Sequence, residues 1–199
     1  IPENVPVLLT LGRVAREKNI DFFIHQMADS KMRSQNAHLV IVGDGPDRER
    51  LESMVHHLHL KDVVHFTGMV KPEEVGMYYR IGDVFVSASQ SETQGLTYIE
   101  AMACGLPLLC LQDICLNSVL TPGKNGYAFE SDLDFFDSFS KIFQSREHLR
   151  LLSSNAYQTA YYFSKEMFAH RAIQLYKDVI IERGVNEKCT RFACIPKRI

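Results

Sequence analysis

Short apolar segments alternate with longer segments of helical periodicity through the first two thirds of the chain. Three of the apolar segments end directly before a glycine, and all are too short for a buried helix, so they are typical of strands in a parallel sheet. The predicted strands are Val7–Leu11, His38–Val42, Val63–Thr67, Val84–Ser87, Pro107–Leu111 and, as the weakest, Tyr127–Phe129.

The intervals between these strands have the apolar spacing of helices. The helices predicted there are Ile20–Met27, Asp47–Leu58, a short helix opened by Pro72-Glu73-Glu74, and Leu96–Ala103. Regular alternation of strand and helix is the pattern of a parallel sheet with helices on both faces. The sequence therefore predicts an α/β fold with a Rossmann-like, doubly wound parallel sheet.

The strand pattern stops after about Ser131, and the rest of the chain is predicted to be helical. The three helices predicted there are Asp132–Gln144, Arg146–Tyr162 and Lys165–Glu182. The last two carry apolar stripes, formed by Leu149, Leu152, Ala156 and Ala160 and by Phe168, Ala172, Leu175 and Ile180. We expect one domain over residues 1–182, and residues 183–199 to form a frayed or loosely docked tail because they have no apolar period.

Composition excludes several classes of protein. Of 199 residues, 46% are hydrophobic and 23% are charged, which is typical of a folded domain and not of a disordered chain. The net charge of −2 lacks the basic excess of nucleic-acid-binding proteins, and no apolar run has the length of a membrane-spanning helix. The five scattered cysteines indicate a reducing compartment. Because the chain begins with Ile1 and a predicted strand follows at once, we expect it to be a piece of a longer protein.

Ligands of doubly wound sheets bind at the carboxyl ends of the strands, so the loops after the strands are the candidate sites. The first loop places Arg13, Arg16 and Lys18 beside Gly12, just before a helix. Guanidinium and ammonium groups in this position are suited to bind phosphate. The alternative is that they are solvated surface charges, with Glu17 as the partner of one of them.

The second loop, G-D-G-P-D-R, resembles a dinucleotide-binding fingerprint but fails it. The third glycine is replaced by Arg48, and the motif follows the second strand instead of the first. We therefore expect a tight turn built on Gly43 and Gly45, in which Asp44 has a structural role. Gly45 could also leave room for a ligand.

The third candidate is the segment Ser87–Pro107, in which a polar loop opens an apolar helix. Backbone N–H groups at Gly95–Thr97 are available there for an anion. Glu92 in the loop and Glu100 in the helix, with seven residues between them, can both face one crevice and accept hydrogen bonds from sugar or ribose hydroxyls. The alternative for Glu100 is a capping box with Thr97, in which it only satisfies a backbone N–H.

A metal site is not expected. His56, His57 and His59 cluster at the end of a predicted helix, but no acid or cysteine lies at ligand spacing. The two C-x4-C pairs of the chain do not have the spacing of a zinc knuckle, and Cys104 and Cys110 are predicted to be small core residues.

Taken together and in order, these loops carry a family resemblance from about Pro6 to Tyr176. The chain resembles the C-terminal, donor-binding domain of family 4 glycosyltransferases of the GT-B fold. The matching motifs are L-G-R-V-A-R-E-K-N, L-V-I-V-G-D-G-P, V-H-F-T-G-M-V, and E-T-Q-G-L-T-Y-I-E followed by A-M-A-C-G-L-P. Within the family, the sequences of these motifs are most similar to those of the bacterial 1,2-diacylglycerol 3-glucosyltransferases. This resemblance implies UDP-glucose as donor and diacylglycerol as acceptor. A soluble sugar or another acceptor is the alternative.

The resemblance also implies residue roles. Arg13 and Lys18 would hold the diphosphate of a UDP-sugar, Glu100 the ribose hydroxyls and Glu92 the hydroxyls of the transferred hexose, so that Arg13, Lys18 and Glu92 are the implied catalytic residues. The implied donor-binding residues are Gly12, Arg13, Lys18, Gly45, Met69, Val70, Glu92, Gln94, Gly95, Leu96, Thr97 and Glu100. Gln94 departs from the pattern, since many relatives carry an aromatic residue there.

The same resemblance implies transfer with retention of configuration and without a metal or other cofactor. It implies a cytoplasmic enzyme whose N-terminal acceptor domain is absent from this chain, with contacts to a membrane surface made through that domain. The chain alone would then bind a donor and transfer nothing. Two other functions remain open at this point: a non-catalytic nucleotide-binding module and a UDP-sugar epimerase.

Overall fold

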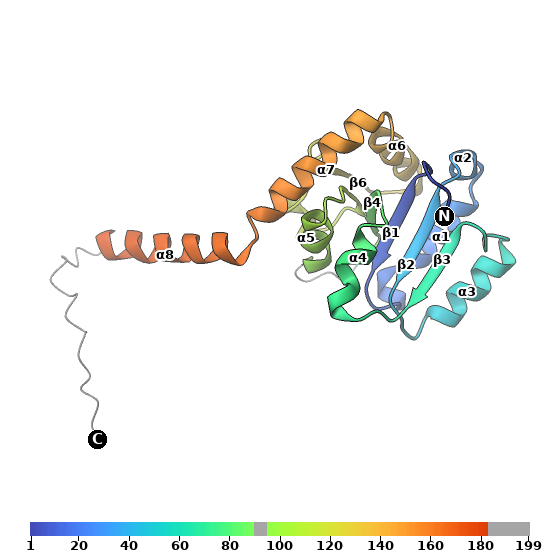
Figure 1. The fold of residues 1–199 in the computed structure, drawn as a ribbon, viewed down its shortest axis with the longest axis horizontal. Coiled ribbons are helices and arrows are strands. Elements are labelled where there is room, and N and C mark those ends of the chain that lie inside the picture. Colours follow the sequence, from blue (N-terminus) through green and yellow to red (C-terminus); the bar gives the residue numbers. More distant parts are fainter. Residues whose placement is uncertain (90–94, 183–199) are drawn as a thin grey trace, which may run out of the picture. The chain divides into compact units, whose positions relative to one another are not determined.

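A computed structural model describes residues 1–89 and 95–182 (Figure 1). Six strands form one parallel sheet in the order β3-β2-β1-β4-β5-β6. The strands are β1 (Val7–Leu11), β2 (His38–Val42), β3 (Val64–Gly68), β4 (Val84–Ser87), β5 (Leu108–Leu111) and β6 (Gly126–Phe129). This order confirms the predicted doubly wound sheet, including the weakest of the six strands.

Helices follow every strand. They are η1 (Arg16–Lys18), α1 (Ile20–Ala28), α2 (Ser30–Ser34), α3 (Arg48–His57), η2 (Pro72–Glu74), α4 (Val75–Tyr79), α5 (Leu96–Ala103), η3 (Cys115–Ser118), α6 (Asp132–Ile142), α7 (Arg146–Tyr161) and α8 (Lys165–Glu182). The predicted bounds agree to within two residues. The short helices η1, α2 and η3 were not predicted, because three to five residues are too few to display an apolar period.

The two faces of the sheet are covered by different helices. On one face, an aromatic cluster joins α1, β6 and α6: Phe22 stacks on Phe129 with ring centroids 5.1 Å apart, and Phe135 meets both rings edge-on. On the other face, Tyr79 of α4 and Tyr98 of α5 pack against Phe85 of β4, with centroids 6.0 and 6.2 Å apart. Because the described helices cover both faces, the loops at the two ends of the strands are the first places to look for a site.

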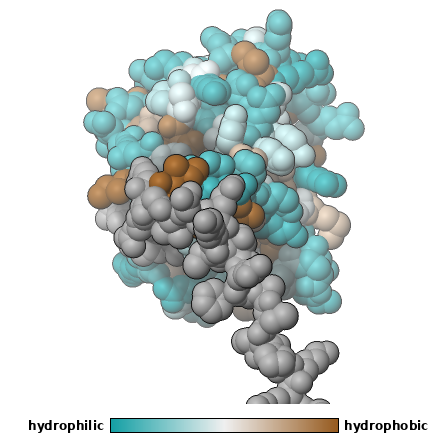
Figure 2. All heavy atoms as spheres, turned by 90° about the vertical axis from the view of Figure 1, so that its left-hand side faces the viewer, coloured by the Kyte–Doolittle hydropathy of each residue, from teal (hydrophilic) through white to brown (hydrophobic). Residues whose placement is uncertain are grey.

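The contacts divide the chain into two units, with the boundary after Ala160. In the first unit the predicted stripe of α7 is buried at Leu152, Ala156 and Ala160. In the second unit α8 carries its stripe exposed, with Phe168 69% exposed and Leu175 62% exposed. Figure 2 shows a largely hydrophilic face on which apolar side chains form small separate groups.

Candidate functional site

The strand order reverses between β1 and β4, and this is where ligands of doubly wound sheets bind. The loop after β1 contains Gly12 to Asn19, and the loop after β4 leads to α5. Both loops leave the sheet at its carboxyl edge because all strands are parallel. The predicted basic loop and the predicted anion-binding helix therefore flank one point of the sheet.

Backbone hydrogen bonds join the loops after the first three strands. The Val14 N–H donates to the Asp44 carbonyl at 2.9 Å, and the Gly43 N–H donates to the Gly68 carbonyl at 3.0 Å. The loops approach so closely that a Cβ at Gly43 would lie 2.0 Å from the carbonyl oxygen of Gly12, and a Cβ at Gly45 would lie 2.2 Å from that of Val14. The two glycines of the second loop thus hold the basic loop in position.

Residues of the basic loop and of α5 line one small cavity of about 20 Å³ at the ends of the strands. Arg13, Lys18 and Thr97 line it together with Ser87, the last residue of β4. Arg13 and Lys18 come from the loop after β1 and Thr97 from the first turn of α5, so the structure brings together three of the predicted phosphate-binding residues.

The other arginine of the basic loop turns away from this cavity. Arg16 forms an ion pair with Asp47, its Nε 3.5 Å from Oδ1. Asp47 also accepts two hydrogen bonds from Arg50, at 2.7 and 2.6 Å, and these hydrogen bonds hold the pKa of Asp47 below its usual value. Arg16 is therefore part of a structural network that joins η1 to α3.

Arg13 has the surface-charge partner that the alternative interpretation named. Its guanidinium forms an ion pair with Glu17, four residues later, and the Arg13 side chain is 66% exposed. A hydrogen bond to the Glu17 backbone and the ion pair with Arg13 lower the pKa of Glu17. Because an exposed ion pair of this kind is weakened by solvent, an anion can compete with Glu17 for the guanidinium.

Asp44 has the structural role that was expected. Its Oδ1 accepts a hydrogen bond from the Gly45 N–H at 2.7 Å, and its Oδ2 pairs with Arg48 at 3.0 Å. Gly45 itself is required by its contact with Val14, so room for a ligand is not needed to explain it.

Helix α5 begins at Leu96, and the capping-box alternative for Glu100 is wrong. The N-cap residue is Gly95, with φ 61°, so Thr97 lies inside the helix and cannot cap it. The Glu100 carboxylate instead accepts a hydrogen bond from the Tyr79 hydroxyl at 3.0 Å. Tyr79 is only 1% exposed, whereas Glu100 is exposed. One oxygen of Glu100 is thus held by a buried side chain of α4, while the carboxylate remains open to solvent.

Other predicted donor-binding residues differ in exposure. Leu96 is 57% exposed and Met69 is 83% exposed, while Val70 and Gly12 are partly buried. Met69 and Val70 follow β3, at the same carboxyl edge as the basic loop. Glu92 and Gln94 lie outside the described residues, so their predicted contacts stay predictions.

Sequence reasoning missed Tyr79 and assigned no role to Ser87 and Ser89. Ser87 lines the small cavity, and the Ser89 hydroxyl donates to the Glu17 carbonyl at 3.4 Å, which joins the loop after β4 to η1. Ser89 is 2% exposed. The signal that could have identified Ser87 and Ser89 is the change from apolar to polar residues at the end of the buried strand β4. No local pattern connects Tyr79 to Glu100, 21 residues away.

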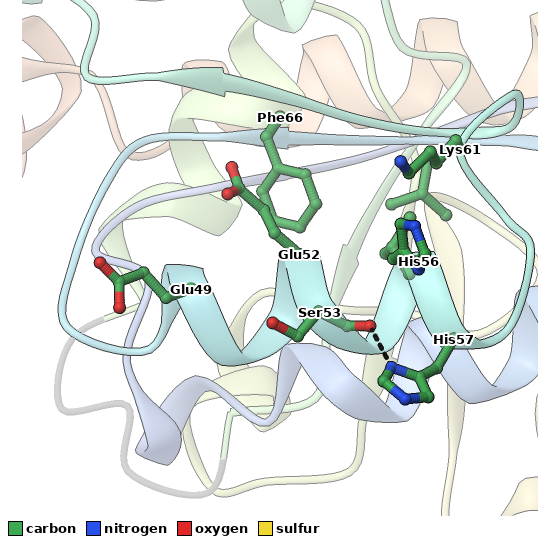
Figure 3. A pocket seen from close by; sticks show the side chains of 9 residues that line it. Glu49, Glu52, Ser53, His56, His57, Lys61 and Phe66 are labelled. Carbon is green, nitrogen blue, oxygen red and sulfur yellow. Dashed lines mark hydrogen bonds between the residues drawn. The ribbon is translucent and has the colours of Figure 1, made fainter.

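A larger cavity, of about 700 Å³, lies beside the edge strand β3 and α3 (Figure 3). Val55, Val64 and Phe66 supply its apolar lining, and Glu49, Glu52 and Lys61 are among its charged residues. His57 lines it as well and donates from Nδ1 to the Ser53 carbonyl at 3.1 Å. None of the predicted site residues lines this cavity.

Two further findings concern residues 1–89 and 95–182. Within them, no group of three or more His, Cys, Asp or Glu side chains is placed to hold a metal ion. No helix among them combines the length and the apolar character that crossing a bilayer requires.

Comparison with known proteins assigns the chain to a family. The model of the family "Glycosyl transferases group 1" matches residues 1–159. An alpha-monoglucosyldiacylglycerol synthase of Acholeplasma laidlawii is 35% identical over 174 residues, which are 87% of this chain and 44% of that protein. A synthase of the same name from Streptococcus pneumoniae is 32% identical, over 100% of this chain and 45% of that protein. The chain thus spans less than half the length of these relatives.

A solved structure has the same fold. The pneumococcal O-GlcNAc transferase GtfA, crystallised with UDP and GlcNAc, superposes with a TM-score of 0.75 at 21% sequence identity. The match covers 89% of this chain and 37% of that one. At this identity the likeness concerns the fold of the chain.

Proposed function

Since the chain belongs to the group 1 glycosyltransferase family, we propose that it is the donor-binding part of an enzyme that transfers a hexose from a nucleotide sugar. The donor we propose is UDP-glucose. The observation that carries the proposal is the convergence of Arg13, Lys18 and Thr97 on one cavity at the switch point of the sheet. Two cations and the start of a helix at one point suit a diphosphate. The transferase crystallised with UDP and GlcNAc, which has the same fold, supports the choice of UDP.

We propose that Glu100 binds the ribose of the donor. An ionised carboxylate accepts hydrogen bonds from two adjacent hydroxyls when its orientation is held. The hydrogen bond from Tyr79 holds the orientation of Glu100, and burial raises the pKa of Tyr79, so its hydroxyl stays protonated and remains a donor. We propose that Tyr79 positions Glu100 for the two ribose hydroxyls.

The other donor contacts are proposed from the family resemblance. Glu92 would hold hydroxyls of the hexose, and Gln94 with the backbone at Gly95–Thr97 would meet the sugar and phosphate. Met69 and Val70 would lie along the edge of the uracil. The position of Met69 and Val70 directly after β3 is compatible with this role.

In the proposed reaction, negative charge develops on the leaving diphosphate as its bond to the sugar breaks. The Arg13 guanidinium, the Lys18 ammonium and the start of α5 would stabilise this charge more in the transition state than in the ground state. They would thereby supply the charge that a metal ion supplies in other transferases. The resemblance implies retention of the anomeric configuration, with the leaving phosphate accepting the proton of the acceptor, so no side chain of this chain is assigned as general base.

We propose diacylglycerol as the acceptor, because the two curated relatives are both named as monoglucosyldiacylglycerol synthases. These relatives are more than twice as long as the aligned part. The acceptor site and the contacts with a membrane surface, on its cytoplasmic side, would then belong to the N-terminal half of such an enzyme. The 199-residue chain alone would bind donor without transferring it.

An assay of the full-length protein tests the acceptor. With labelled UDP-glucose, we expect labelled glycolipid from micelles that contain diacylglycerol and no product from a soluble sugar acceptor. Transfer to the soluble sugar alone would reassign the acceptor and leave the transferase proposal intact. Release of an epimerised UDP-sugar without any acceptor, or nucleotide binding without transfer in either assay, would contradict the proposed reaction.

Replacing Glu100 by glutamine tests the ribose role. Glutamine can still accept the hydrogen bond from Tyr79 through its amide oxygen, so the midpoint of thermal unfolding should not change. The neutral amide is a weaker acceptor for two hydroxyls than a carboxylate, and we expect UDP affinity to fall by roughly tenfold. Calorimetric titration with UDP measures the affinity. Unchanged affinity would contradict the role of Glu100.

Tyr79→Phe is the matched variant for the positioning role. It keeps the buried ring and removes only the hydroxyl, at a cost in stability of about 1 kcal/mol. UDP affinity should fall severalfold. In the Glu100→Gln background the same substitution should have a smaller effect, because the carboxylate that it orients is already gone. Equal effects in both backgrounds would mean that Tyr79 acts independently of the Glu100 carboxylate, which would contradict the positioning role.

A further inference from the structure

A second large cavity, of about 940 Å³, lies at the amino ends of the strands. It is lined by the segment that precedes β1, by the residues between α4 and β4, by those between α5 and β5, and by the first half of α7. The strands are parallel, so this cavity lies at the edge of the sheet opposite to Arg13 and Lys18. All of its residues belong to the first compact unit.

Three arginines from two parts of the chain line this cavity. Arg80 follows α4, and Arg146 and Arg150 lie one turn apart on α7, so they share one face of that helix. Arg146 donates a hydrogen bond at 2.6 Å to the side chain of Asn4, which also lines the cavity. Burial raises the pKa of the Cys104 thiol, another lining group, above its usual value, although the nearby Arg80 guanidinium acts in the opposite direction.

The positive charge of the cavity is not balanced by acids. Asp83 is the one carboxylate among the described lining residues. It accepts a hydrogen bond from the Val7 N–H at 2.9 Å, and burial raises its pKa. Within the described residues, none of the three arginines forms a salt bridge. Three guanidinium groups around one hollow, each without an acidic partner there, indicate an anionic ligand.

We propose that this cavity binds a phosphate-bearing anion. Guanidinium groups present paired N–H donors whose spacing matches two phosphate oxygens. The positive end of the dipole of α7 lies at Arg146 and adds to the attraction. The volume is in the range of small-molecule sites, so the cavity can accept more than the phosphate group itself. The phosphate can belong to a free metabolite or to the headgroup of a phospholipid.

Titration of the chain with glycerol 3-phosphate tests the free form of the ligand. The Arg13→Ala variant is used throughout, so that binding at the proposed donor site does not contribute. We expect saturable binding by calorimetry, weakened about tenfold by Arg146→Gln and about tenfold by Arg80→Gln, as for the loss of one charge-assisted contact. Lys177→Gln on α8 removes the same charge outside the cavity and should leave the affinity unchanged.

Vesicles distinguish the second source of phosphate. We expect the chain to co-sediment with phosphatidylcholine vesicles that contain phosphatidic acid, and less so in Arg80→Gln and Arg146→Gln, if the natural ligand is a headgroup. Binding to glycerol 3-phosphate without co-sedimentation would assign a free metabolite. Binding of neither probe, or binding that both arginine variants leave unchanged, would overturn the proposal. Because Arg13 is absent in these titrations, the result is independent of the donor site.

Discussion

Replacing Arg13 by alanine should abolish the thermal protection that UDP and UDP-glucose give to this chain. A ligand present at 100 times its dissociation constant stabilises the folded state by about 2.7 kcal/mol, and the proposed site loses one of its two cations. Without nucleotide, the unfolding midpoint should hardly change, because the Arg13 side chain is 66% exposed and contributes only a surface ion pair. In the full-length enzyme we expect the rate of transfer to fall by about 10²-fold or more.

Arg16→Ala is the matched control. Arg16 lies three residues further along the same loop, but it pairs with Asp47. This variant should keep the nucleotide protection and lose a little stability. Thermal unfolding with and without UDP, followed for both variants, separates the two arginines. Protection that survives in Arg13→Ala, or that is lost equally in both variants, would count against the phosphate role of Arg13.

Gly43→Ala should destabilise the fold and disturb the site at once. The new Cβ would lie 2.0 Å from the Gly12 carbonyl oxygen, and the residue has a φ of 124°, which side chains rarely adopt. Backbone strain of about 1–3 kcal/mol and overpacking of about 1–3 kcal/mol together predict a loss of roughly 2–6 kcal/mol. The midpoint of thermal unfolding should fall by on the order of 10 °C.

Gly76→Ala gives the control for this substitution. Gly76 lies in α4, where an added Cβ has nothing within 4 Å, and its φ is not in the left-handed region. Alanine should therefore stabilise the helix there by roughly 0.5–1 kcal/mol. Nucleotide affinity should fall in Gly43→Ala at a temperature where the protein is still folded, because the displaced loop carries Arg13. A Gly43→Ala protein as stable as Gly76→Ala would contradict the close approach of the loops.

The sequence by itself was sufficient for the fold class and for locating the basic loop after β1. Buried parallel strands appear in the sequence as short apolar runs, because both of their faces are covered. Such a run can be recognised from a few neighbouring residues. The loop after β1 could be identified in the same way, since ligands bind where strands end at a switch point. Arg13 and Lys18 were therefore accessible to reasoning from neighbours in the chain, and the structure places both at one cavity.

What each side chain of that loop does was decided by the tertiary structure. By position in the loop Arg13 and Arg16 are both candidates to bind phosphate, but Asp47, directly before α3, pairs with Arg16 and not with Arg13. The need for glycine at position 43 arises from the approach of the loop after β1.

The partner of Glu100 and the arginine cavity were likewise decided only in three dimensions. Thr97 and Glu100 have the spacing of a capping box, but the helix begins before Thr97, and the packing of α4 against α5 brings Tyr79 to Glu100. Arg80 and Arg146 line one cavity because the parallel sheet places the segments before β1, β4 and β5 at one edge, beside the start of α7. A periodic pattern reports which face of an element is buried. It does not report which distant element covers that face, and this is why these contacts appear only in the folded chain.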